Sequence, residues 1–143
     1  MQKLFLPVRN YLMIVVATLV LIASAPAANA GEFGDLKTEM EAARASLLTM
    51  LMRSDMRGPE QQKLVIDTAN AVSAHLAKMT APTGKEAQFN EMVENWNAFK
   101  QTRENELTTA ILSGNEAEAK NIAGGVQKER ITKCLTIVDE LDV

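Results

Sequence analysis

Residues 65–79 read VIDTANAVSAHLAKM, and the spacing of the apolar side chains in this segment indicates the fold class. The interval between successive apolar positions alternates between four and three residues, at Val65, Ala69, Val72, Leu76 and Met79. An α-helix brings such positions onto one face, whereas a half-buried β-strand would place apolar residues at every second position. The segment therefore predicts an amphipathic helix that buries one apolar stripe.

The same helical spacing recurs on both sides of this segment, and glycine or proline separates the periodic stretches. The separators are Gly58-Pro59, Pro82-Thr83-Gly84 and Gly114. Joints this short make successive helices antiparallel neighbours. We therefore predict an all-α fold, an up-down-up-down antiparallel four-helix bundle, with helices at about 36–57, 60–80, 85–113 and 116–142.

Residues at the ends of these segments match the preferences of helix termini. We expect Asp35 to cap the first helix and Pro59 to lie in the first turn of the second. Gly114 is expected to end the third helix in a left-handed conformation, and Asn115 to cap the fourth. The pair Gly124-Gly125 interrupts the fourth helix, where each glycine costs about 1 kcal/mol relative to alanine. The pair provides either space for a ligand or a close helix crossing, or it is a tolerated kink.

Residues 1–30 have the organisation of a secretory signal peptide. Lys3 and Arg9 precede an apolar run of about a dozen residues, and Ala28-Asn29-Ala30 then provides a pattern that signal peptidase accepts. A bilayer-spanning helix needs roughly 20 apolar residues, so the run is short for a membrane span. We expect cleavage after Ala30 and a periplasmic or secreted bundle at residues 31–143, with an uncleaved membrane anchor as the alternative.

Composition excludes several functional classes. The chain has 143 residues, which suits one domain, and residues 31–143 contain 18 acidic and 13 basic side chains. This acidic balance argues against a nucleic-acid partner. One cysteine leaves no internal disulfide or cysteine-based zinc cluster, and one histidine makes a histidine metal centre or a catalytic triad a poor prediction. No nucleophile–base or carboxylate pair has a defensible spacing, so we expect no enzymatic activity and no metal site.

Two arginines interrupt the apolar stripes of the third and fourth helices. Arg103 follows Phe99 by four residues, and Arg130 precedes Cys134 by four, so we expect both to face inward. Because arginine presents a planar fork of donors, the two side chains could converge on a carboxylate or phosphate. In the alternative interpretation, each extends its head group to solvent or pairs with an acidic neighbour among Glu104, Glu106 and Glu129.

Residues 94–100 (ENWNAFK), 112–119 (LSGNEAEA) and 137–141 (IVDEL) resemble the four-helix-bundle sensor domain of bacterial methyl-accepting chemoreceptors. In that family a tryptophan and a second aromatic residue precede a Gly-Asp/Asn, Glu-Ala turn, and a leucine-rich helix follows. The resemblance covers about residues 86–143, and its tryptophan, Trp96, joins Arg103 and Arg130 as a candidate ligand-binding residue. Members of the family continue into a second membrane span and a signalling region. We therefore expect a sensor-like module without its own transmitter domain.

Residues 34–40 (GDLKTEM), together with the segment from Gly114 to Lys120 and Arg130, resemble small periplasmic b-type cytochromes of four-helix build. The resemblance implies Met40 as a ligand of haem b and places the family's histidine ligand at Cys134. A Cys/Met pair is not that family's ligand set, and the sequence has no Cys-x-x-Cys-His motif for covalent attachment. Cys134 on a core face is otherwise expected to be a small apolar residue.

These observations predict an exported, non-enzymatic, sensor-like helical bundle that binds a small molecule or a partner protein and carries no cofactor. A periplasmic haem-binding electron carrier is the alternative function. A sensor would respond to its ligand by a shift or rotation of packed helices. Passing such a response across a membrane would need a partner protein or a homodimer, and the only membrane contact we expect is through an uncleaved signal segment.

Overall fold

The computed structural model describes residues 31–142, and all regular secondary structure in this part of the chain is helical, as predicted. The predicted signal peptide at residues 1–30 lies outside the described residues. The elements are α1 (Glu32–Met52), η1 (Ser54–Met56), α2 (Pro59–Leu76), α3 (Glu86–Thr102), η2 (Arg103–Leu107), α4 (Thr108–Leu112), α5 (Glu116–Gly124) and α6 (Val126–Leu141).

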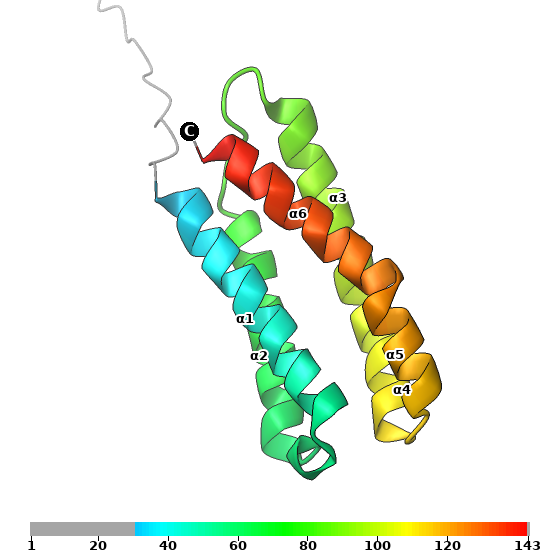
Figure 1. The fold of residues 1–143 in the computed structure, drawn as a ribbon. Helices are drawn as coiled ribbons and strands as arrows, with labels where there is room; N and C mark the ends of the chain where they lie inside the picture. The colour runs from blue at the N-terminus through cyan, green and yellow to red at the C-terminus, as the bar shows by residue number, and fades with distance from the viewer. Residues whose placement is uncertain (1–30, 143) are drawn as a thin grey trace, which may run out of the picture.

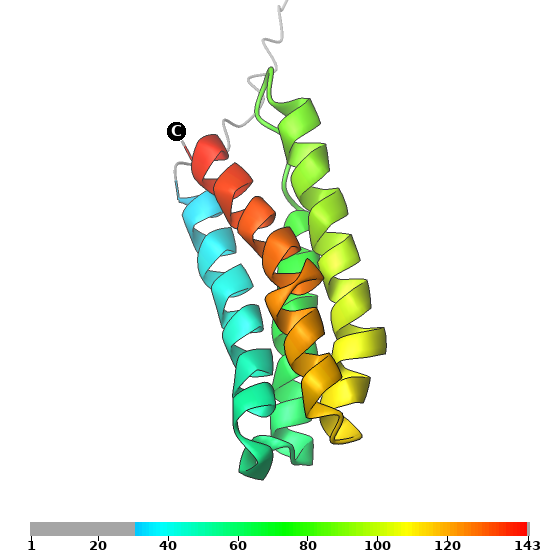
Figure 2. The same cartoon turned by 45° about the vertical axis from the view of Figure 1, so that its right-hand side comes forward.

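These elements form four helical rods that lie side by side (Figures 1 and 2). α1 and α2 are one rod each, α3 continues through η2 into α4, and α5 continues into α6. α1 packs against α2 and α6, and α3 packs against α6. None of the helices within residues 31–142 is both long enough and apolar enough to cross a bilayer.

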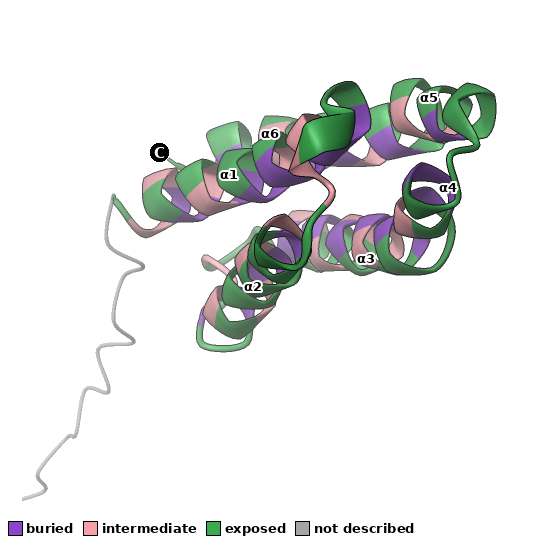
Figure 3. Ribbon diagram, turned by 90° about the horizontal axis from the view of Figure 1, so that it is seen from below, coloured by how far each residue is buried: buried purple, intermediate pink, exposed green. Residues whose placement is uncertain are grey.

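The apolar stripes face one another in the interior, as the purple inner faces in Figure 3 show. All five stripe positions predicted for the second rod are buried, from Val65 through Met79. The larger core cluster is built from all four rods and contains Phe33, Met40, Trp96 and Cys134. A smaller cluster lies toward the joint between α4 and α5 and contains Leu47, Leu107 and Ala119.

Helix α1 begins and ends earlier in the sequence than expected. It begins at Glu32, so Asp35 lies within its first turn and is not its cap; Phe33, which is buried, draws the first turn into the core. The helix ends at Met52 because Arg53 takes an extended conformation. Arg57, expected in the last turn, instead folds back and donates to the carbonyl oxygens of the helix end at Met50 (2.9 Å) and Leu51 (3.3 Å).

The other predicted helix termini have the expected chemistry. Pro59 begins α2, although this helix ends at Leu76, before the expected boundary near residue 80. Gly114 has φ +76°, the left-handed conformation predicted for it. Asn115 caps α5 by accepting a hydrogen bond from the backbone N–H of Glu118.

A π-helical turn, η2, corrects the register of the third rod. In an unbroken α-helix the stripe that runs through Phe99 and Arg103 would continue at both Glu106 and Leu107, three and four residues further on. The π turn adds a residue, as its closing bond from the Thr108 N–H to the Arg103 carbonyl shows. Leu107 is buried as a result, and Glu106 is exposed. The inserted residue therefore keeps the Glu106 carboxylate out of the core.

The Gly124-Gly125 pair breaks the fourth rod between α5 and α6. A Cβ atom at Gly125 would lie 2.9 Å from the backbone oxygen of Asn121, whereas a Cβ atom at Gly124 would have nothing within 4 Å. The two neighbouring glycines thus differ in what they do. Gly125 permits a close backbone approach at the break, and Gly124 does not.

This difference predicts opposite effects of alanine at the two positions. Gly125→Ala should lower the free energy of unfolding by about 1–2 kcal/mol, because the new methyl group meets fixed backbone. Gly124→Ala should raise it by about 0.5–1 kcal/mol, because alanine is the better helix former and has room. Urea denaturation followed by circular dichroism measures both, and equal effects of the two substitutions would contradict the asymmetry.

Candidate functional site

Arg103 is fully buried on the inward face of the third rod. It lies at the start of η2, and its guanidinium reaches across the bundle to the α1–α2 pair. It donates to the carbonyl oxygen of Ala43 in α1, to that of Val65 in α2, and to the Ser46 hydroxyl at 3.3 Å. A single side chain from the third rod therefore contacts both of the first two rods.

No carboxylate within residues 31–142 forms an ion pair with this buried guanidinium. Burial lowers the pKa of Arg103 to about 10, and the charge of Glu104 opposes this shift. The side chain remains protonated at neutral pH, so carbonyl and hydroxyl dipoles solvate a full positive charge. Its Nε has no hydrogen-bond partner among the described residues.

Arg130 and Trp96 also have protein partners. Arg130 is half-buried and donates to the carbonyl oxygen of Ala98 at 3.0 Å and to the Thr102 hydroxyl. Trp96 is fully buried, and its indole N–H donates to Ser73 at 3.0 Å. The structure therefore does not join the two arginines and Trp96 into one open anion site. Arg103 faces α1 and α2, whereas Arg130 is bound to α3.

Neither of the alternatives considered for the arginines describes Arg103. Its head group neither extends to solvent nor pairs with Glu104, which forms its ion pair with Lys100 at 3.0 Å. Backbone carbonyl oxygens of α1 and α2 accept its hydrogen bonds where a carboxylate was expected. A helix-spacing argument places Arg103 inward but contains no information about which oxygens face it there.

These contacts predict unequal importance of the two arginines for stability. Arg103→Ala should lower the free energy of unfolding by about 2–4 kcal/mol, because it removes three cross-rod hydrogen bonds and leaves a void. Arg130→Ala should lower it by less than about 1.5 kcal/mol, because this side chain is only partly buried and its hydrogen bonds reach one other rod. Urea denaturation of the two variants makes the comparison, and a larger loss for Arg130→Ala would contradict it.

A second buried polar side chain, Gln127, lies at the beginning of α6 and is 3% exposed. Neither its Nε2 nor its Oε1 atom has a hydrogen-bond partner among the described residues. A buried amide without partners is costly, because each unsatisfied polar group loses about 1–3 kcal/mol of solvation. Gln127 is therefore the least satisfied polar side chain of the described core.

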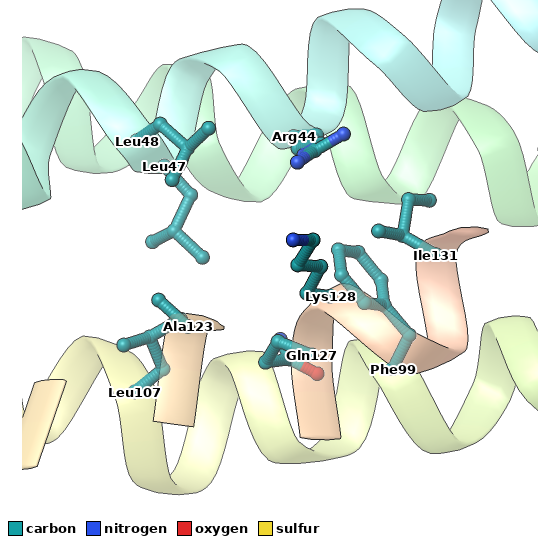
Figure 4. A pocket seen from close by; sticks show the side chains of 9 residues that line it. All are labelled: Arg44, Leu47, Leu48, Phe99, Leu107, Ala123, Gln127, Lys128 and Ile131. Carbon is teal, nitrogen blue, oxygen red and sulfur yellow. The ribbon is translucent and has the colours of Figure 1, made fainter. Parts of the chain in front are cut away.

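Gln127 borders a cavity of about 30 Å³ between α1, the third rod and the α5–α6 break (Figure 4). Most of its wall is apolar, formed by Leu47, Leu48, Phe99, Leu107, Ala123 and Ile131. Arg44 approaches the cavity from α1 and Lys128 from α6 (Figure 4). Neither cation forms an ion pair with a carboxylate anywhere in residues 31–142. The cavity thus combines an apolar wall, one unsatisfied amide and two free positive charges.

The cavity residues were not among the candidate ligand-binding residues predicted from the sequence. The spacing of Arg130 from Val126 and Cys134 suggested an inward Arg130, but Val126 is 38% exposed and Gln127 is buried. A signal for Gln127 does exist. Gln127, Ile131, Cys134, Val138 and Leu141 are spaced by four, three, four and three residues, which is the helical stripe that the structure buries.

Met40 and Cys134 do not fit a haem. Both are fully buried in the larger core cluster, and neither borders the Gln127 cavity. Burial raises the pKa of the Cys134 thiol to about 12, which disfavours the thiolate that would ligate iron. The thiol instead donates to the carbonyl oxygen of Met92, with Sγ 3.6 Å from that oxygen. Within residues 31–142, no three His, Cys, Asp or Glu side chains are grouped to hold a metal ion.

The state of Cys134 predicts slow thiol chemistry. Because its pKa is about 12 and its side chain has no exposed surface, the native protein should react with Ellman's reagent at pH 8 at least a hundredfold more slowly than the unfolded protein. Absorbance at the wavelength of the released thiolate measures both rates. A native rate within tenfold of the unfolded rate would show that Cys134 is accessible.

Comparison with known proteins gave no match to any protein-family model, curated protein or solved structure. The resemblances to chemoreceptor sensor domains and to b-type cytochromes therefore stay predictions from sequence.

Proposed function

We propose that this chain is an exported, non-enzymatic, sensor-like module that binds a small molecule in the Gln127 cavity of an up-down-up-down antiparallel helical bundle. The single observation that carries the proposal is the Gln127 amide, which is buried against the cavity with neither of its polar atoms partnered. A bound molecule with polar groups would satisfy this amide. Ligand sites commonly combine an apolar wall with a few placed polar groups in this way.

The position of the cavity supports a sensing role. Its wall is formed by α1 on one side and by α6 on the other, and these two helices pack against each other in the fold. Leu107, at the end of the π turn, belongs to the same wall. A ligand that fills the cavity contacts all of these elements, so binding would favour one arrangement of α1 against α6 over others. Such a differential contact is the requirement for a ligand-driven helix shift.

The segments that carry the resemblance to the sensor family lie in ordered parts of the bundle. The tryptophan–aromatic pair of the resemblance, Trp96 and Phe99, packs together in the core with ring centroids 5.3 Å apart. The Gly-Asn turn at 114–115 joins α4 to α5 with the conformation expected of it. The proposal of a sensor-like module takes these two segments as its basis.

Substitution of Gln127 should separate stability from binding. Gln127→Leu removes the unsatisfied amide, so it should raise the free energy of unfolding of the ligand-free protein by about 1 kcal/mol or more. It should also abolish any thermal stabilisation that wild-type protein gains from a panel of organic acids, amino acids, amines and sugars. Gln101→Leu, at an exposed position of α3, is the matched control and should leave both properties unchanged.

Differential scanning fluorimetry of the three proteins against this panel provides the measurement. A ligand that stabilises wild-type and Gln127→Leu protein equally would exclude the cavity as the site. A marked loss of stability in ligand-free Gln127→Leu would show that Gln127 has a structural partner.

A further inference from the structure

The groups around the Gln127 cavity restrict the chemistry of a ligand. Two cations flank it without an acidic partner in the described chain, Arg44 from α1 and Lys128 from α6. This local charge is positive in a segment, residues 31–143, where acidic side chains outnumber basic ones. An anion placed between the two cations would gain favourable charge interactions, and a carboxylate matches the planar fork of Arg44.

The volume of the cavity restricts the size of the ligand. A cavity of about 30 Å³ has room for two or three water-sized groups, since one such group needs roughly 10–15 Å³. The apolar wall includes the side chains of Leu47, Phe99, Leu107 and Ile131. A methyl or ethyl group fits there, and a long acyl chain does not. The carboxylate must then lie at the mouth, where Lys128 is exposed.

The amide of Gln127 restricts the ligand further, because it lacks both a donor for Oε1 and an acceptor for Nε2. A carboxylate oxygen accepts from Nε2 but leaves Oε1 without a donor, because an ionised carboxylate has no proton to donate. A hydroxyl on the carbon next to the carboxylate supplies that donor. The hydroxyl and one carboxylate oxygen then face the two ends of the amide together.

We infer that the Gln127 cavity binds a short aliphatic 2-hydroxycarboxylate, with its carboxylate between Arg44 and Lys128, its hydroxyl on Gln127 and its alkyl group against Leu47, Phe99, Leu107 and Ile131. This inference rests on the proposed function, and it names the ligand class of the same site. A ligand with so few atoms gains limited binding energy, so the expected dissociation constant is on the order of 1 mM.

Titration of the ¹⁵N-labelled protein with 2-hydroxypropanoate, followed by NMR, tests the inference. The Gln127 side-chain NH₂ signals should shift with saturation. Propanoate, which lacks the hydroxyl, and 2-hydroxypropanamide, which lacks the charge, should each bind at least tenfold more weakly. Octanoate should bind no more tightly than propanoate, which separates a short free acid from a lipid-derived one.

Two charge-removal variants complete the test. Arg44→Gln/Lys128→Gln should weaken 2-hydroxypropanoate binding at least tenfold. Lys78→Gln/Lys85→Gln removes two charges from the exposed α2–α3 connection and should leave the affinity within twofold of wild type. This control distinguishes local charge at the cavity from the net charge of the protein.

The outcomes distinguish failure of the ligand class from failure of the site. Equal binding of 2-hydroxypropanoate, propanoate and 2-hydroxypropanamide, lost in Gln127→Leu, would overturn the ligand class and leave the proposed function in place. Octanoate binding tenfold tighter than 2-hydroxypropanoate would also overturn it. If no compound of the wider panel shifts the Gln127 signals, the ligand class and the proposed function both fail.

Discussion

The buried guanidinium of Arg103 is the constraint on which the arrangement of the rods depends. It lies at 0% exposure, and three oxygens from α1 and α2 accept its hydrogen bonds. A desolvated charge tolerates few alternatives, because losing the acceptors of its Nη groups would add to the cost of the Nε donor that already lacks a partner. The apolar stripes can slide against one another at modest cost, but Arg103 cannot leave the Ala43 and Val65 carbonyls without losing its solvation. It therefore fixes the height of the third rod against the first two.

The cavity at Gln127 follows from that constraint. Phe99 and Leu107 lie four residues before and four residues after Arg103, and both line the cavity. On α1, the acceptors Ala43 and Ser46 directly precede Arg44 and Leu47, which line the opposite side. The break at Gly125 then begins α6 with Gln127 turned inward. One polar contact, one π turn and one glycine break together place an unsatisfied amide between two helices.

Sequence periodicity was sufficient for the helical class and the buried stripe of α2, because those features depend only on which residues avoid water. The left-handed conformation of Gly114 and the cap at Asn115 could also be predicted from the sequence, since a local backbone requirement selects those residue types. The helix boundaries were harder to predict. Asp35 has the chemistry of a cap, but burial of Phe33 extends α1 past it, and that is a tertiary effect.

The candidate site depends on two local breaks in the helices, and the spacing of apolar residues does not predict where these breaks lie. The π turn is followed by a buried Leu107 and leaves Glu106 exposed, and the Gly125 break is followed by a buried Gln127 and a Val126 that is 38% exposed. An unbroken helix leaves Glu106 and Leu107 about equally inward, and a stripe drawn through Val126 does not include Gln127. The spacing of Arg130 from Cys134 within α6 predicts an inward side chain, whereas the structure half-buries it against α3. Two of the three acceptors of Arg103 are backbone oxygens of segments distant in sequence, and the pattern of side chains along the chain does not predict such contacts.

The most direct test of this account is an NMR measurement of the Arg103 guanidinium in the native protein. A head group held by three acceptors without access to solvent should give separate, slowly exchanging Nη–H signals with cross-peaks to α1 and α2. Arg53, whose side chain is 60% exposed, provides the internal reference and should give one averaged, rapidly exchanging signal. An averaged Arg103 signal like that of Arg53, or contacts to a carboxylate in place of the Ala43 and Val65 segments, would contradict the account.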